Sequence, residues 1–118
     1  MDLINLSLIV LSGVSFVIYG VLLFFSKKMQ EEFIRFKLEK FILLVGALEL
    51  LGGVGILLGI QYNWILIFSS LGLGVLMMLG FITRLKLKDS FLLSFPSLFF
   101  MLLNFYILYL SIIKITSL

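Results

Sequence analysis

Four apolar runs, each long enough to cross a lipid bilayer, dominate this sequence. They cover about residues 3–25, 41–60, 64–83 and 91–113. About 20 helical residues cross a hydrocarbon core of about 30 Å, because each residue adds about 1.5 Å. Backbone groups in lipid must be hydrogen-bonded within the protein, which allows helices or closed barrels, and these runs lack the alternation of barrel strands. The sequence therefore predicts four transmembrane helices in one domain over residues 1–118.

The composition agrees with a membrane protein. Hydrophobic residues make up 63% of the chain and charged residues 13%, whereas a soluble domain has about 45–50% and about 25%. A chain of 118 residues cannot bury that much apolar surface in one small core. The first run follows Met1-Asp2 with no basic residue before it, and it is too long for a signal peptide. We therefore expect it to be a helix of the mature protein.

Histidine and cysteine are both absent. This excludes disulfides, thiol redox chemistry, a histidine general base and zinc sites of the usual kind. We expect no catalytic residue, no metal site and no cofactor, and an enzyme is the least favoured class of function. We also expect no nucleic-acid partner.

The basic residues predict an orientation in the membrane. Eight of the nine fall in two connections, residues 26–40 and 84–90, and only Lys114 lies elsewhere. Positively charged loops stay in the cytoplasm. We therefore expect a multi-pass protein of the cell (inner) membrane, with both basic loops cytoplasmic and both termini outside.

The first basic connection carries apolar residues near helical spacing, at Met29, Phe33, Phe36 and Phe41. This predicts an amphipathic cytoplasmic segment over about residues 27–40. It is either a short helix in the headgroup layer or an extension of the second span, and the sequence favours neither.

Acidic residues weigh against a strong attraction of these loops to anionic lipids. They interrupt both basic clusters, at Glu31, Glu32, Glu39 and Asp89.

Small residues mark the faces on which the helices should pack. Transmembrane helices associate by close packing at such residues and by a few hydrogen bonds. In the second span, Gly46, Glu49 and Gly53 share one stripe. The predicted fold is an all-α, up-down, four-helix bundle with short connections. The glycines expected at its helix contacts are Gly46, Gly52, Gly53, Gly55, Gly59, Gly74 and Gly80.

Glu49 is the one acidic residue deep inside a span. It lies about 14 Å from the cytoplasmic end of its helix, near the midplane. A carboxylate facing lipid there would cost at least about 2.5 kcal/mol, so we expect it to point into the bundle. We expect it to be hydrogen-bonded there, and protonated unless Arg84 reaches it. The residues predicted to form an interior polar site with Glu49 are Ser15, Tyr19, Arg84, Ser97 and Asn104.

The run RFKLEKFILLVGALELLGGVGILLG, followed by LGLGVLMMLGFITRLKLKDSFLLSFPSLFFMLLNFYIL, resembles the DoxX-like family of small membrane proteins. The resemblance extends from about residue 10 onward. In that family a basic and aromatic segment enters a glycine-rich second helix that carries Glu or Gln. The matching positions are Arg35, Phe36, Gly46, Glu49, Gly52, Gly55, Gly59, Met78, Gly80, Arg84, Lys88, Asp89 and Pro96.

The resemblance implies a four-helix membrane protein. The family's name derives from a membrane subunit linked to thiosulfate oxidation with quinone, and other relatives help to assemble membrane proteins. Related quinone-using thiol oxidoreductases depend on cysteine pairs, so their chemistry does not carry over to a chain without cysteine.

Two functions then compete. The first is a non-catalytic bundle that binds a lipid, a quinone, a partner membrane protein or a second copy of itself around Glu49. The second is a small proton-coupled exporter in which Glu49 exchanges a proton for a cationic substrate. Glu49 as a purely structural residue is the plainest interpretation, and it stays open.

Overall fold

The structure, a computed structural model, describes residues 3–116 and the side chains of residues 3–114. Its helices are α1 (Leu3–Phe25), α2 (Lys27–Arg35), the 3-10 turn η1 (Glu39–Phe41), α3 (Ile42–Leu58), α4 (Asn63–Lys86) and α5 (Phe91–Thr116). Four stretches are long and apolar enough to cross a membrane: Leu3–Phe25, Glu39–Leu58, Asn63–Lys86 and Phe91–Lys114. The prediction of an all-α membrane bundle is therefore confirmed.

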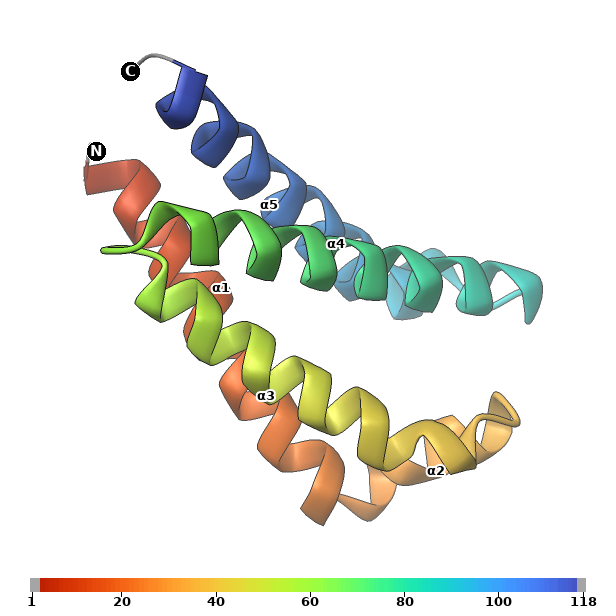
Figure 1. The fold of residues 1–118 in the computed structure, drawn as a ribbon. Helices are drawn as coiled ribbons and strands as arrows, with labels where there is room; N and C mark the ends of the chain where they lie inside the picture. The colour runs from red at the N-terminus through yellow and green to blue at the C-terminus, as the bar shows by residue number, and fades with distance from the viewer. Residues whose placement is uncertain (1–2, 117–118) are drawn as a thin grey trace.

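The four long helices run up and down and form two pairs, α1 with α3 and α4 with α5 (Figure 1). At one end lie Leu3, Thr116 and the turn between α3 and α4, which we call the terminal end. At the other end, the basic end, lie α2 and the connection between α4 and α5. The two pairs meet toward the terminal end and diverge toward the basic end.

Glycines bring α1 and α3 into backbone contact at two levels. A Cβ atom added to Gly53 would lie 2.8 Å from both the Gly13 carbonyl oxygen and the Val17 nitrogen. One level further toward the basic end, a Cβ on Gly20 would lie 2.9 Å from the Leu50 nitrogen and 3.1 Å from the Gly46 oxygen. Neither contact leaves room for a side chain, so these glycines set the distance between the two helices.

The contact between α3 and α4 also depends on glycines, but it covers only half of the helices. Gly52 packs against Leu73, and Gly59 packs against Leu66. Gly55 lies between them against Ser69. No described glycine beyond Gly52 makes such a contact toward the basic end, which is where the pairs diverge.

Two glycines of α4 face α5, and a third faces open space. Gly74 packs against the Phe105 ring, and a Cβ on Gly80 would make an ordinary contact, at 3.5 Å, with the Ser97 hydroxyl oxygen. A Cβ on Gly72 would meet no described atom within 4 Å.

The core lies where the two pairs meet. Its buried side chains come from all four long helices: Ile9, Phe16, Ile56, Leu66, Leu73, Phe100, Leu103 and Ile107. A buried hydrogen bond crosses the same region, from the Ser12 hydroxyl to the Asn104 side-chain oxygen at 2.8 Å. In an apolar surrounding, this bond satisfies two polar groups and joins α1 to α5.

The connection at the start of α2 ties this short helix to α1. Ser26 is the N-cap, and its hydroxyl accepts from the Met29 N–H. The Gln30 amide donates to the carbonyls of Leu23 and Phe24, each at 3.0 Å. These carbonyls belong to the last turn of α1, where intrahelical donors run out.

We predict opposite outcomes for two glycine-to-alanine substitutions. Gly53→Ala should lower the free energy of unfolding by about 1–3 kcal/mol, because the new methyl group collides with backbone atoms of α1. Gly72→Ala should be neutral, or should stabilise by up to about 1 kcal/mol, because its methyl group enters open space and the flexible glycine is lost. Reversible unfolding in mixed detergent micelles, followed by circular dichroism, measures both. Equal effects would contradict the packing described for α1 and α3.

Candidate functional site

Glu49 lies on α3, seven residues before the core residue Ile56, on the stripe that also carries Gly46 and Gly53. Its side chain is only 6% exposed. Gly52 is the glycine of α3 nearest the basic end that contacts α4, and Glu49 lies about one helical turn further toward that end. A buried carboxyl group therefore lies where the two helix pairs begin to separate.

Glu49 forms no hydrogen bond and no ion pair with any described residue. This differs from the expectation that it is hydrogen-bonded inside the bundle. The physical reason is that two of its expected partners, Asn104 and Arg84, form hydrogen bonds or ion pairs with other residues. Asn104 accepts from Ser12 and donates to the Phe100 carbonyl at 2.7 Å, and Arg84 pairs with Asp89.

The other three expected members of the site are less enclosed than Glu49. Ser15 on α1 and Ser97 on α5 are partly buried. Tyr19 is partly exposed, and its ring packs edge-on against Phe16 and Phe100. The structure therefore brings no described hydroxyl or cation into hydrogen-bonding contact with Glu49.

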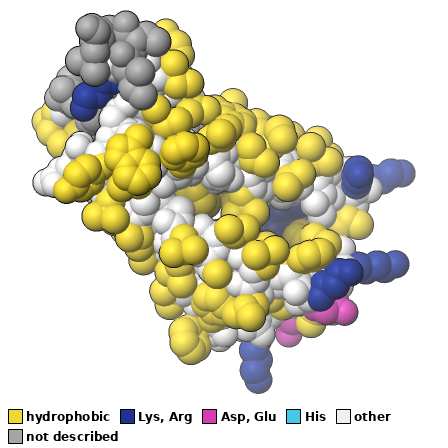
Figure 2. Space-filling model, in the orientation of Figure 1, with side chains coloured by type: hydrophobic (Ala, Val, Ile, Leu, Met, Phe, Trp, Pro, Cys, Tyr) yellow, Lys and Arg dark blue, Asp and Glu magenta, His cyan; other side chains and the backbone are white. Residues whose placement is uncertain are grey.

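An apolar groove runs along the seam between α3 and α4, with a volume of about 410 Å³. Figure 2 shows this face of the molecule, which is largely hydrophobic and hollowed between the helices. Leu48 and Gly52, on either side of Glu49 in the chain, contribute to the groove wall. Gly72 also lines it, so the missing side chain at this position helps to keep it open. The remaining lining residues are Leu51, Phe68, Ser69, Leu73, Val75, Leu76 and Leu79.

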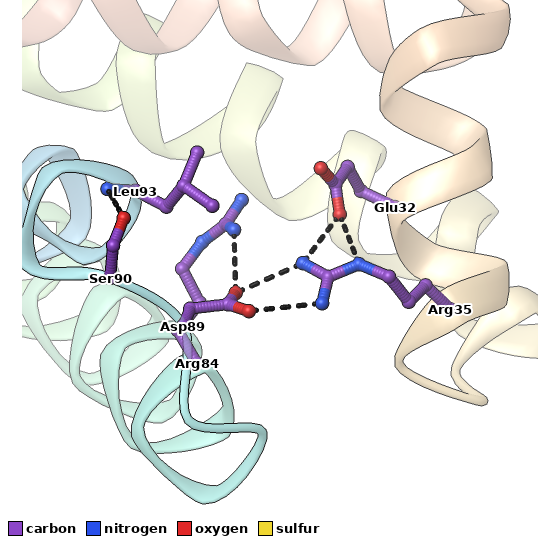
Figure 3. A network of polar contacts seen from close by, with 6 residues as sticks. All are labelled: Glu32, Arg35, Arg84, Asp89, Ser90 and Leu93. Carbon is purple, nitrogen blue, oxygen red and sulfur yellow. Dashed lines mark hydrogen bonds and ion pairs between the residues drawn. The ribbon is translucent and has the colours of Figure 1, made fainter.

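A second cluster of polar residues closes the basic end (Figure 3). The Arg35 guanidinium donates to both oxygens of Asp89, at 3.0 and 2.9 Å, and its Nε donates to Glu32 at 2.8 Å. Arg84 donates to the same aspartate at 3.1 Å. The Phe36 ring lies near both guanidinium groups, 4.9 Å from that of Arg35 and 5.1 Å from that of Arg84. We call Glu32, Arg35, Arg84 and Asp89 the ion-pair link, because they join α2 to the α4–α5 connection.

Two helix ends place these side chains. Lys37 and Lys88 adopt positive φ angles of 61° and 59°, just beyond the ends of α2 and α4. The Leu38 N–H then bonds to the Phe33 carbonyl, and the Asp89 N–H bonds to the Arg84 carbonyl, at 2.8 and 3.0 Å. This is the Schellman pattern of a helix end. It turns the chain sharply after each helix, so that Asp89 folds back beside Arg84.

A comparison with protein families matches residues 7–106 to the DoxX-like family. The match covers Glu49, the groove and the whole ion-pair link. The chain belongs to the DoxX-like family. No curated protein and no solved structure gives a match to it.

The ion-pair link of this DoxX-like protein was not predicted as a unit. Sequence reasoning assigned Arg84 to Glu49 and treated Arg35 and Asp89 as loop charges. Asp89 follows Arg84 by five residues, and this spacing at a helix end was the available signal for their pairing. Nothing in the sequence indicated that Arg35, 54 residues away from Asp89, would complete it.

Two further observations limit what chemistry the DoxX-like bundle offers. The Ser94 hydroxyl on α5 is buried and has no hydrogen-bond partner among the described residues. Within residues 3–116, no group of three or more Asp, Glu, His or Cys side chains is placed to hold a metal ion. Glu49 and Ser94 are therefore two buried polar side chains without a hydrogen-bond partner among the described residues.

The ion-pair link holds the pKa of Asp89 below its ordinary value. The hydrogen bond from Arg35 is the main cause, and the bond from Arg84 adds to it, while burial acts in the opposite direction. The carboxyl is only 7% exposed in the folded protein. Because the unfolded state binds the proton more tightly, this group stabilises the fold above its ordinary pKa and ceases to do so in more acid solution.

We predict that Asp89→Asn lowers stability at neutral pH, and that the difference from the unsubstituted protein shrinks as the pH falls below about 3.8, the ordinary value of this carboxyl. Urea unfolding in detergent at a series of pH values measures the difference. Glu31→Gln, which removes an exposed acid outside the link, is the matched control and should show only a small effect on stability. An Asp89→Asn difference that is the same at every pH would contradict the pairing.

Proposed function

We propose that this DoxX-like membrane protein binds a lipid-class molecule, a quinone or a lipid with a long apolar chain, at an interior site around Glu49. The observation that carries the proposal is a buried carboxyl group without a partner among the described residues, on the same helix as Leu48, Leu51 and Gly52, which line an apolar groove. The function is binding, with Glu49 as the polar anchor.

The free energy of burial supports a ligand for Glu49. A polar group that loses water without gaining a hydrogen bond costs about 1–3 kcal/mol. A ligand with a hydroxyl or carbonyl oxygen can supply the missing bond, because a protonated carboxyl both donates and accepts. Leu48, the residue before Glu49, lines the groove, so we propose that the polar head of a ligand in the groove reaches the Glu49 carboxyl group from there.

The groove suits the apolar part of such a molecule. Binding pockets for small ligands have volumes of about 300–1,000 Å³, and the groove's volume of about 410 Å³ falls in this range. Its lining is almost entirely aliphatic, with the exposed Gly72 on one wall. An acyl or isoprenoid chain can occupy it from the surrounding bilayer.

The distribution of basic residues supports a proposal for how the site is oriented in the membrane. We propose that the two basic loops face the cytoplasm and both termini face outward, in the cell (inner) membrane, because eight of nine basic residues lie at the basic end. Glu49 would then lie near the midplane, and the groove would face the acyl chains.

We predict that Glu49→Leu and Gly72→Leu each reduce the amount of bound amphiphile about tenfold, which corresponds to about 1.4 kcal/mol. The first removes the polar anchor, and the second fills the groove without meeting another described atom close to its Cβ. The measurement is organic extraction of the protein purified in mild detergent, followed by mass spectrometry of the extract per mole of protein.

Two control variants separate binding from general damage. Val54→Leu places a leucine at an exposed position outside the groove, and Glu39→Gln removes an exposed acid. Both should bind as the unsubstituted protein does. A protein that carries no amphiphile, or equal amounts in all variants, would refute the proposal.

Other outcomes would point to the competing functions. Loss of a co-purifying polypeptide in Gly72→Leu, with no change in lipid, would indicate a partner membrane protein. A substrate-driven proton flux in liposomes that is abolished by Glu49→Gln would indicate the proton-coupled exporter.

A further inference from the structure

The ion-pair link leaves the net charge of the basic end unchanged but determines which of its charged side chains are paired. Two of the four acids that interrupt its basic clusters, Glu32 and Asp89, are bound to Arg35 and Arg84. The link is therefore neutral as a unit. The charges outside it are six lysines and two glutamates, Glu31 and Glu39.

The six lysines come from both basic loops, and every one of them is exposed. None forms an ion pair with a described residue. Figure 2 shows basic side chains projecting from this end of the molecule, with one acidic patch beside them. We call this set the lysine surface: Lys27, Lys28, Lys37, Lys40, Lys86 and Lys88.

We propose that the lysine surface binds the headgroups of anionic phospholipids in the leaflet that surrounds the basic end. The argument is charge complementarity at a fixed depth. The lysines lie at or just beyond the ends of α1, α2 and α4, where helices of this length leave the hydrocarbon core. Flexible lysine stems can follow the apolar surface while their ammonium groups remain at the headgroup level.

The ion-pair link also arranges the lysine surface. The bidentate Arg35–Asp89 contact holds α2 against the α4–α5 connection. Lys37 lies two residues after the end of α2, and Lys88 directly precedes Asp89, so lysines of both loops flank the link. Arginines bind carboxylates bidentately, whereas lysines act as mobile point charges. This division of roles leaves the lysines available for phosphate.

The lysine surface is distinct from the groove, and its occupancy does not depend on a ligand at Glu49. None of its residues lines the groove. The two proposals can therefore fail separately.

The test compares phospholipid selectivity in nanodiscs made of phosphatidylcholine with a minor fraction of phosphatidylglycerol. Phospholipids retained on the protein after transfer to detergent are counted by native mass spectrometry. The unsubstituted protein should retain phosphatidylglycerol in preference to phosphatidylcholine. Replacing Lys27, Lys28, Lys86 and Lys88 by glutamine should reduce this preference by about fivefold per lysine near the surface.

Three arms make the result specific. Lys114→Gln removes a lysine outside the basic loops and should leave the preference unchanged. Glu31→Gln removes an exposed acid outside the ion-pair link and should not weaken phosphatidylglycerol retention, because it removes a negative charge. Inorganic phosphate should compete no better than sodium chloride of the same ionic strength if a bilayer headgroup, and not free phosphate, is the ligand. No preference in the unsubstituted protein, or an equal preference in the four-lysine variant, would overturn the proposal.

Discussion

Backbone contact between α1 and α3 is the constraint on which the rest of this bundle depends. In lipid, apolar side chains gain little by leaving acyl chains for one another, so helices associate where their backbones can approach closely. Gly13 with Gly53, and Gly20 with Gly46, provide two such approaches one above the other. They fix α3 in position against α1 and leave its adjacent face to meet α4.

The contact between α3 and α4 then determines where along the bundle the two helix pairs are packed together and where they are apart. It runs from Gly59 to Gly52 and ends one turn before the level of Glu49. The core residues and the Ser12–Asn104 bond occupy the closed half. Beyond it the pairs diverge, and Glu49 lies on α3 one turn past Gly52, which is the last glycine in contact with α4 and lines the groove. The end of the glycine contacts along this seam thus coincides with the level of the buried carboxyl group.

At the basic end, ion pairs rather than close helix packing connect the two helix pairs. The helix pairs are no longer joined there by glycine contacts, and the ion-pair link spans from α2 to the α4–α5 connection instead. Its two arginines neutralise two acids, and the lysines around it stay unpaired with the described part of the chain. The same four residues therefore join the two halves of the protein and leave the lysines as the unpaired basic side chains of this end.

The apolar runs, their length and the glycine stripes were sufficient to predict four membrane helices, the up-down bundle and the family, because hydrocarbon solvent permits few other arrangements. The burial of Glu49 also follows from the cost of exposing a carboxyl group to lipid. What the sequence did not contain was the partner of each polar group. From the sequence alone, Arg84 could pair with either Glu49 or Asp89. The sharp turn at Lys88 brings Asp89 beside Arg84, and the two form a hydrogen bond. Asn104 meets Ser12, and Arg35 meets Asp89, across distances of 92 and 54 residues. Such pairings depend on helix rotation and on the angle between pairs of helices, which are properties of the packed tertiary structure.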